Sequence, residues 1–266
     1  MLSEAIVCIF STQVTNNPMN AFCKSLFTLI LIVIIDNAIA QSHETKNIQN
    51  DWVSSFNQSG DLKPFYREAS GILQENKLIT GGENIGKKWL ELHSQAGAIT
   101  EYKLIETIQL IETSKFELGA YLTEKGSSYY TIIGWRNNNG WYKEVEVTYK
   151  AVNPGPDEAG EIKLLRDSWQ KLANDHRPDL IGKELYIDGG YYFNRGRVYS
   201  NLEIADVYSY MNPESFKISL EGLSTTIVNE ETAYDIGGFQ TSGKGLYILI
   251  WIKKENEWKL LLDFNF

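Results

Sequence analysis

The sequence predicts an α+β protein of two tandem domains, each with helices first and a curved antiparallel sheet after them. The chain repeats itself at a nearly fixed spacing, because Trp52 recurs as Trp169 and Trp141 as Trp258, both 117 residues later. A repeat longer than about 100 residues is too long for a solenoid unit, so it indicates two copies of a whole domain. Within each copy helical patterns precede a series of strand patterns, an order typical of α+β rather than βαβ proteins.

The first copy is predicted to span residues 45–150. Ile48, Trp52, Val53 and Phe56 form the apolar stripe of an amphipathic helix. Strand patterns joined by short polar turns follow the last predicted helix. The elements expected here are a short helix at 62–66, a strand at 72–79, a helix at 83–95, and strands at 101–112, 115–123, 128–136 and 141–149.

The second copy is predicted to span residues 160–266, after a linker at 151–159. The stretch Val152–Glu158 contains two of the six prolines and shows no apolar periodicity, which is typical of a linker. The second copy repeats the order of the first. Its expected elements are a helix to about residue 174, a turn at Pro178, a strand near 185–188, residues 202–211 in place of the third helix, and strands at 216–223, 226–240, 245–253 and 258–266.

The composition supports a folded protein that does not bind nucleic acid. Hydrophobic residues make up 43% of the 266 residues, enough for a core in each copy. The net charge is −9 and the sequence contains no basic run. Binding to nucleic acid phosphates needs clustered Lys and Arg, so no nucleic-acid partner is expected.

The N-terminus has the pattern of a signal peptide at residues 1–40. Lys24 precedes the apolar run Ser25–Ile35, and Ala38-Ile39-Ala40 fits the small-residue cleavage pattern. We therefore expect cleavage between Ala40 and Gln41 and a secreted or periplasmic protein. The alternative is an uncleaved membrane anchor, although the run is short for a span.

Two further features of the N-terminus bear on this expectation. Met19 would give a signal with the usual short charged start, so it is an alternative translation start. Both cysteines, Cys8 and Cys23, precede the expected cleavage point. The mature chain would then have no cysteine, which excludes disulfides, thiol catalysis and cysteine metal sites.

The repeated order of elements, with Trp in the first helix and a polar turn before Trp at the last strand, resembles the NTF2-like superfamily. Within it the chain is most similar to SnoaL-like and DUF4440-type domains. This resemblance implies a cone, in which a curved sheet wraps around helices and leaves a pocket at its open end. It also implies pairing through the sheets, as an intramolecular pseudo-dimer or a homodimer. The residues that carry it are Trp52, Phe65-Tyr66, Gly82, Ile85, Trp89 and Gly140-Trp141 in the first copy, and Trp169, Leu180, Gly196, Leu202, Gly237-Gly238 and the stretch from Trp258 to Asn265 in the second.

The resemblance also implies a kind of chemistry, because the superfamily includes ketosteroid isomerase-like enzymes and cyclases that use a carboxylate or histidine base inside an apolar cone. A buried carboxylate has a raised pKa and can transfer protons near neutrality. Asp188 and Asp263 are the candidate bases of the second copy, and for Asp263 a structural hydrogen bond to a turn is the alternative. The candidates of the first copy are Glu106, Glu144 and Glu146, although strand alternation places Glu144 and Glu146 on a solvent face.

Aromatic residues of the second copy form the strongest binding signal. Seven lie within 25 residues: Tyr186, Tyr191, Tyr192, Phe193, Tyr199, Tyr208 and Tyr210. They either line a pocket for a small hydrophobic or aromatic ligand or fill the core. The predicted ligand-binding residues are Tyr186, Tyr191, Tyr192, Asn194, Arg195 and Tyr208. The three histidines, His43, His93 and His176, show no metal-ligand spacing, so neither a metal nor a cofactor is expected.

Three functions remain open on the sequence. The first is a secreted or periplasmic protein that binds a small molecule or a partner. The second is an isomerase, dehydratase or cyclase that uses Asp188 or Asp263 in the cone of the second copy. The third is a dimerising module without a ligand. An acid with a raised pKa at the bottom of an apolar pocket would favour the enzyme, since perturbed titratable groups gather at active sites.

Overall fold

The computed structural model describes residues 44–151 and 159–266. The predicted signal peptide, the alternative start at Met19, both cysteines and most of the linker lie outside the described residues. Within the described part of the chain, no helix is long and apolar enough to cross a membrane.

The first copy contains the helices and the strand meander that the sequence predicts. A helix at residues 44–57 opens it. The expected strand at 72–79 is instead a hairpin, because Glu75 and Asn76 adopt left-handed backbone angles, with φ of 49° and 61°, and reverse the chain. The other elements are η2 (Lys63–Phe65), β1 (Tyr66–Gln74), β2 (Lys77–Thr80), α3 (Gly82–Ala96), β3 (Ile99–Ile111), β4 (Ser114–Thr123), β5 (Ser128–Asn137) and β6 (Trp141–Lys150).

The second copy repeats this order with shorter helical segments. Its first strand is longer than predicted and continues through Gly189-Gly190 to Asn194. The break expected between 223 and 226 lies instead at Glu230-Glu231, where a turn separates two strands. The elements are α4 (Ala159–Asn174), α5 (Pro178–Leu180), η3 (Ile181–Leu185), β7 (Tyr186–Asn194), β8 (Arg197–Ser200), η4 (Asn201–Glu203), α6 (Ile204–Val207), η5 (Tyr208–Met211), β9 (Ser219–Asn229), β10 (Thr232–Gln240), β11 (Lys244–Lys254) and β12 (Glu257–Asn265).

Each copy forms one six-stranded sheet, and the two sheets have the same topology. The strand order is β2-β1-β6-β5-β4-β3 in the first and β8-β7-β12-β11-β10-β9 in the second. The sheets are mixed rather than wholly antiparallel, because β1 pairs with β6, and β7 with β12, in parallel. The reason is that the last strand of each meander returns beside the first strand and runs in the same direction as it.

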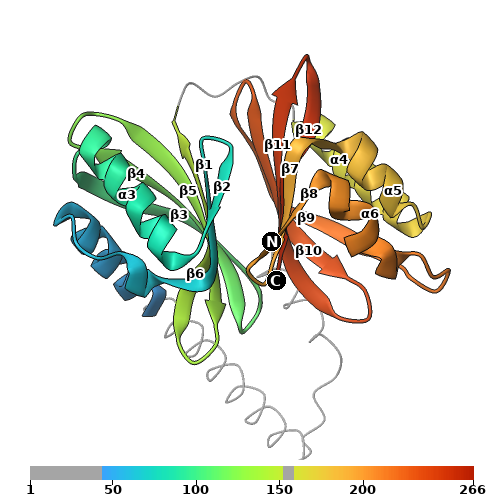
Figure 1. Ribbon diagram of the computed structural model, residues 1–266, viewed down its shortest axis with the longest axis horizontal. Helices are drawn as coiled ribbons and strands as arrows, with labels where there is room; N and C mark the ends of the chain where they lie inside the picture. The colour runs from blue at the N-terminus through green and yellow to red at the C-terminus, as the bar shows by residue number, and fades with distance from the viewer. Residues whose placement is uncertain (1–43, 152–158) are drawn as a thin grey trace, which may run out of the picture. The chain divides into compact units, whose positions relative to one another are not determined.

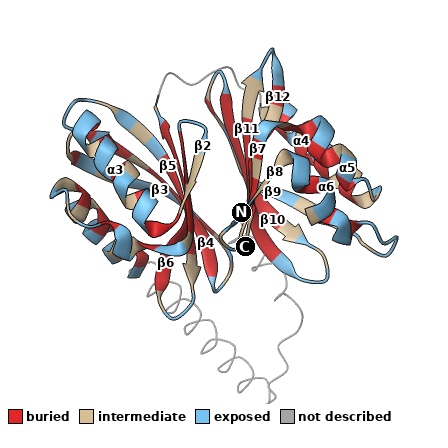
Figure 2. Ribbon diagram, in the orientation of Figure 1, coloured by how far each residue is buried: buried red, intermediate tan, exposed pale blue. Residues whose placement is uncertain are grey.

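Helices cover one face of each sheet, and a core lies between the helices and that face (Figures 1 and 2). In the first copy Trp52, Phe56 and Trp89 are fully buried there, and Trp52 meets Trp89 edge to face with ring centroids 5.0 Å apart. In the second copy the core under α4 and α6 includes Trp169 and Trp251. Burying such side chains stabilises the fold by about 1.5–3 kcal/mol each.

A β-bulge in the last strand of each sheet changes which side chains face the helices. The register shifts between Gly134 and Trp135 in the pairing of β5 with β6, and between Ile250 and Trp251 in the pairing of β11 with β12. The extra residue interrupts strict alternation. The expectation that Glu144 and Glu146 face solvent is wrong, since they are only 2% and 1% exposed. The reason is that both faces of β6 are covered: Val145 and Val147 pack in one apolar cluster, and Glu146 contacts Tyr66 in the core under the helices.

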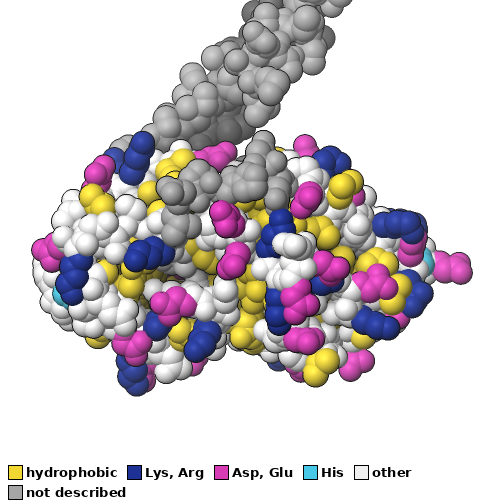
Figure 3. Space-filling model, turned by 90° about the horizontal axis from the view of Figure 1, so that it is seen from above, with side chains coloured by type: hydrophobic (Ala, Val, Ile, Leu, Met, Phe, Trp, Pro, Cys, Tyr) yellow, Lys and Arg dark blue, Asp and Glu magenta, His cyan; other side chains and the backbone are white. Residues whose placement is uncertain are grey.

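Charged side chains of both signs are interspersed on the molecular surface that Figure 3 shows. Lys and Arg side chains lie beside Asp and Glu side chains, and no continuous basic area is visible in this view. An interspersed surface of this kind creates little long-range attraction for phosphate backbones.

Candidate functional site

A buried carboxylate lies at the centre of the second sheet. Asp263 is on β12, where it pairs with Leu249 of β11 on one side and with Tyr192 of β7 on the other. Asp263 is only 3% exposed to solvent. Because central strands are held by ladders on both sides, the backbone fixes the position of this carboxylate.

Two tyrosine hydroxyls donate hydrogen bonds to Asp263. The Tyr208 hydroxyl lies 2.7 Å from Oδ2, and the Tyr186 hydroxyl lies 3.4 Å from the same oxygen. Burial raises the pKa of both tyrosines well above the ordinary value, so both keep their protons and act as donors. Within the described residues these bonds reach only Oδ2, and Oδ1 receives none.

The environment of Asp263 favours its neutral form. Burial raises the pKa of Asp263 to about 7, and the hydrogen bonds from Tyr208 and Tyr186 oppose that shift only in part. No Lys, Arg or His of residues 44–151 and 159–266 forms an ion pair with it. A carboxyl group with this pKa takes up and releases a proton close to neutral pH.

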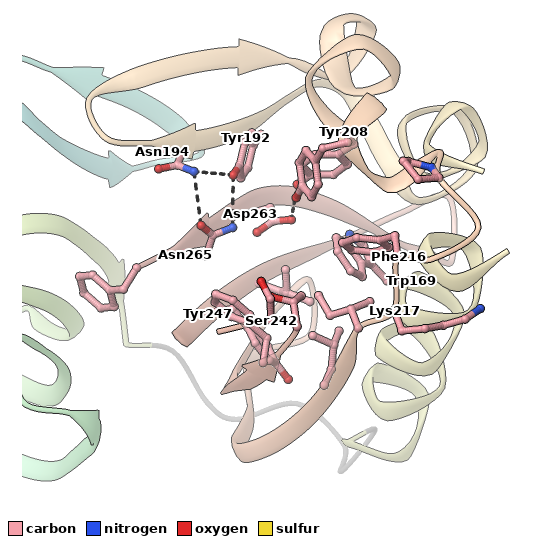
Figure 4. A pocket seen from close by; sticks show the side chains of 18 of the residues that line it. Trp169, Tyr192, Asn194, Tyr208, Phe216, Lys217, Ser242, Tyr247, Asp263 and Asn265 are labelled. Atoms are coloured by element: carbon pink, nitrogen blue, oxygen red, sulfur yellow. Dashed lines mark hydrogen bonds between the residues drawn. The ribbon is translucent and has the colours of Figure 1, made fainter. Parts of the chain in front are cut away.

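Asp263 opens onto a cavity of about 800 Å³ in the second copy (Figure 4). This volume falls within the range of about 300–1,000 Å³ that is typical of small-molecule sites. Aromatic side chains come from the helix, the strands and the loop between η5 and β9. The aromatic lining residues are Trp169, Tyr192, Tyr208, Tyr210, Phe216, Phe239, Tyr247 and Phe266.

A small amide network fixes one wall of the cavity. Asn194 donates from Nδ2 to the Tyr192 hydroxyl over 2.6 Å, and Asn265 donates to the same oxygen over 3.3 Å. The two amides also interact with each other at 3.4 Å. In Figure 4 this network lies beside Asp263, on the opposite side of the cavity from Trp169 and Phe216. The wall therefore presents oriented polar groups next to an aromatic surface.

The structure brings together part of the predicted site. Tyr192, Asn194, Arg195, Tyr208 and Asp263 all line the cavity. Tyr186 contacts Asp263 without being a lining residue. Tyr191 packs in another apolar cluster, on the other face of its strand.

Two of the candidate bases, Asp188 and Glu106, are exposed. Asp188 is exposed and does not line the cavity, so it cannot act as a buried base there. Asp188 lies where the pairing of β7 with β12 is irregular, between Tyr186 and Tyr191, and the next residue, Gly189, has a φ of 78°. For Asp263, the expected alternative was a structural hydrogen bond to a turn, and one of its two tyrosine partners, Tyr208, lies in the short segment η5. In the first copy Glu106 is exposed as well.

Sequence reasoning missed the half of the cavity that β10, β11 and the loop before β9 supply. Phe216, Phe239 and Tyr247 line it from segments read only as strands. Asn265 follows Asp263 by two residues, so strand alternation from Asp263 was a signal that could have found it. In the described residues no group of three His, Cys, Asp or Glu side chains could hold a metal ion.

The chain matches solved structures that are similar to one copy at a time. They include an NTF-2 like protein of unknown function from Shewanella oneidensis MR-1, at 12% identity, over 40% of this chain and 96% of that chain with a TM-score of 0.36. A ketosteroid isomerase-like protein from Erwinia carotovora atroseptica SCRI1043 matches at 14% identity, over 41% and 95%, with a TM-score of 0.36. An NTF2-like protein from Cytophaga hutchinsonii ATCC 33406 matches at 10%, over 41% and 98%, with a TM-score of 0.35. No protein-family model and no curated protein matches the sequence.

The two copies of this chain share one topology. Helices, a hairpin, a crossover helical segment and a four-stranded meander follow one another, and the meander ends beside the first strand. Each copy is an α+β unit with its own six-stranded mixed sheet. At these identities the likeness concerns the fold alone, and the fold hosts many functions.

The two copies carry a carboxylate at the same place, but its surroundings differ. Glu146 of the first copy lies on β6 and accepts a hydrogen bond of 2.5 Å from Tyr66, as Asp263 does from Tyr186. However, Glu146 also forms an ion pair with Lys143 at 3.0 Å, and Lys143 is fully buried. The first copy therefore neutralises its central carboxylate with its own lysine, whereas the carboxylate of the second copy lies beside a cavity.

Proposed function

We propose that the cavity of the second copy binds a small hydrophobic or aromatic molecule, with Asp263 as its polar anchor. The observation that carries this proposal is a carboxyl group only 3% exposed in the wall of an aromatic cavity of about 800 Å³. The aromatic rings provide apolar contact area, and the amides of Asn194 and Asn265 provide orientation.

A structural role explains Asp263 less well than a binding role does. Burying a carboxylate without a counter-charge is unfavourable by several kcal/mol in its ionised form. Asparagine at this position would accept the same hydroxyl bonds from Tyr208 and Tyr186 without that penalty. A residue that destabilises the fold in this way is expected where function uses it.

Native mass spectrometry of the purified full chain tests the binding proposal. We expect a retained small-molecule mass in the wild type and in the control Asp188→Asn, because Asp188 lies outside the cavity. Leu220→Trp should lose that mass, since Leu220 lines the cavity and the larger ring fills it. A clean mass in the wild type, or an adduct that survives Leu220→Trp, would contradict the proposal.

The second candidate is an acid–base enzyme of the isomerase, dehydratase or cyclase kind, as in SnoaL-like and ketosteroid isomerase-like proteins. The observation that favours it is the pKa of Asp263, which burial raises to about 7. A carboxylate in a water-poor cavity is a stronger base than one in water, and its neutral form is present at neutral pH as the matching acid.

Ring opening of nitrobenzisoxazole tests this acid–base chemistry. Asp263 would take the proton from the ring carbon while the electron pair forms the nitrile and the nitrogen–oxygen bond breaks to give the absorbing phenolate. We expect Asp263→Asn to lower the rate at least about 100-fold, the usual contribution of a general base. The rate should rise with pH to a plateau above about pH 7, because only the carboxylate accepts the proton. Equal rates in Asp263→Asn and Asp188→Asn would exclude Asp263 as the base.

We also propose that the two sheets pair with each other as an intramolecular pseudo-dimer. One apolar cluster includes buried residues from both sheets, and the Phe116 ring lies 6.2 Å from that of Phe264 and 5.0 Å from that of Phe266. The native mass spectrum described above also reports on this pairing. A single-chain mass supports the pseudo-dimer, and a dimer mass supports pairing between chains instead.

Export of the protein, with cleavage between Ala40 and Gln41, completes the proposal. The support is the charged residue, apolar run and small-residue site at residues 24–40. N-terminal sequencing of the protein from its native source checks this, with Gln41 as the expected first residue.

A further inference from the structure

The two copies match each other residue by residue around the central carboxylate. Lys143 and Leu260, like Glu146 and Asp263, are 117 residues apart. The pairing registers agree with this match, because Tyr66 pairs with Lys143 in the first sheet and Tyr186 pairs with Leu260 in the second. Trp52 and Trp169 show the same spacing of 117 residues and lie in the first helix of each copy.

In the first copy, these positions hold an ammonium group between a carboxylate and an aromatic ring. Lys143 Nζ lies 3.0 Å from Glu146 Oε2 and 3.9 Å from the centre of the Trp52 ring. Lys143 is fully buried, and Glu146 is 1% exposed. The ion pair and the cation–π contact together compensate for the lost hydration of both charges.

In the second copy the carboxylate and the tryptophan are kept, but the ammonium is missing. Leu260 has no charge, and no described cationic side chain forms an ion pair with Asp263. The space beside Asp263 is the cavity, which Trp169, Tyr192 and Tyr208 line. These aromatic faces suit a cation as well as an apolar body.

We propose that the ligand of the second copy is an organic amine, whose ammonium group pairs with Asp263 as Lys143 pairs with Glu146. The rest of the ligand is an aromatic or aliphatic body that packs against the rings of the cavity. This inference rests on the proposed function of the cavity and names the chemical class of its ligand.

The other charged and titratable groups around the cavity are compatible with an amine. The tyrosines around Asp263 and the cavity remain neutral, because burial raises the pKa of each; they are Tyr186 and Tyr192 of β7, Tyr208 and Tyr210 of η5, and Tyr247 of β11. The cations Arg195 and Lys217 also line the cavity, but both are exposed at its mouth, where solvent and salt screen them. Lys217 Nζ is directed to the carbonyl oxygen of Asn174 at 3.2 Å, and it points away from Asp263 in Figure 4.

Two probes of the same shape test the amine: naphthylmethylamine, which is charged, and naphthylmethanol, which is not. Calorimetric titration of the full chain at about pH 8 should show the amine bound at least about tenfold more tightly, as a close charge pair implies. Asp263→Asn should remove this preference while the alcohol still binds, and Asp188→Asn should leave it unchanged. Below about pH 7 the preference should fall about tenfold per pH unit, because Asp263 becomes neutral.

Leu260→Lys offers a second variant that imitates the first copy. The new ammonium should pair with Asp263 and abolish binding of the amine. If this variant does not fold, the loss of the preference for the amine in Asp263→Asn still tests the inference. Equal affinity for the two probes, or a preference that survives Asp263→Asn, would overturn the inference and leave the cavity as a binding site for neutral molecules. Failure of both probes to bind would overturn the inference and the proposed function together.

Discussion

Replacing Asp263 by asparagine is expected to stabilise the protein above about pH 7, because the substitution removes a buried acid that folding prevents from ionising freely. The folded state raises the pKa of Asp263 from the ordinary 3.8 to about 7. Below about pH 4 the carboxyl is protonated in the folded and unfolded chains alike, so Asp263 does not lower the free energy of unfolding there. As pH rises toward 7, the unfolded chain loses the proton of Asp263 while the folded chain keeps it. The free energy of unfolding therefore falls as pH rises.

The size of this effect follows from the pKa shift. The free energy of unfolding of the wild type should fall, relative to Asp263→Asn, by about 1.4 kcal/mol per pH unit between about pH 4 and 7. The total is about 4 kcal/mol, which is large against a typical stability of about 5–15 kcal/mol. Urea unfolding of both proteins across this pH range measures it.

Asp188→Asn is the matched control for this experiment. Asp188 is an exposed aspartate of the same copy, so its replacement should change the free energy of unfolding by less than about 0.5 kcal/mol at every pH. If the difference between wild type and Asp263→Asn does not change with pH, Asp263 titrates normally and the account of the site is wrong.

The opposite result is expected in the first copy, where Lys143→Met should destabilise the protein strongly. The change leaves Glu146 buried without its ion-pair partner and removes the ammonium from the Trp52 ring. Breaking one side of a buried ion pair costs about 3–5 kcal/mol. The free energy of unfolding from urea or thermal denaturation at neutral pH measures the loss.

Two variants show whether the loss comes from the unpaired charge. Lys143→Met with Glu146→Gln should recover much of the stability, because the neutral amide still has Tyr66 and Thr131 as partners. Lys87→Met removes an ion pair that is 67% and 70% exposed, and it should change stability by less than about 1 kcal/mol. A double variant no more stable than the single one would show that the lysine stem, rather than the charge, carries the effect.

The repeat made much of the fold predictable from the sequence. Trp52 and Trp169 lie in buried positions on the first helix of each copy, as their apolar stripes indicate. The meander strands from Ile99 to Lys150 follow the predicted pattern closely, since polar turns and alternating side chains are local signals. The parallel pairing of the first and last strands was not predictable in this way, because it joins residues that are far apart in the sequence.

The site was predictable only in part, for a related reason. Asp263 could be named because it is an acid among apolar residues at the end of the chain. Its tyrosine partners, Tyr186 and Tyr208, are 77 and 55 residues away, so only the folded sheet brings them together. Glu146 was expected on a solvent face because the face of its strand opposite Val145 and Val147 was taken to be exposed, whereas the helices of the first copy cover that face.

The comparison of the copies indicates how a duplicated domain can divide its roles. The first copy fills the space beside its central carboxylate with Lys143, and the ion pair makes that interior a structural element. The second copy has Leu260 at the matching position and keeps a cavity. The exchange of lysine for leucine at this position leaves the central carboxylate of the second copy without a counter-charge from its own strand.

The most direct measurement is the titration of Asp263 itself, followed by carboxyl-carbon NMR in the full chain and assigned by its loss in Asp263→Asn. We expect a midpoint near 7 in the free protein and a fall of that midpoint when naphthylmethylamine is added. A midpoint near the ordinary value of about 4, unchanged by the amine, would contradict it. That result would mean that water reaches the carboxylate freely and that the second copy holds no buried acid.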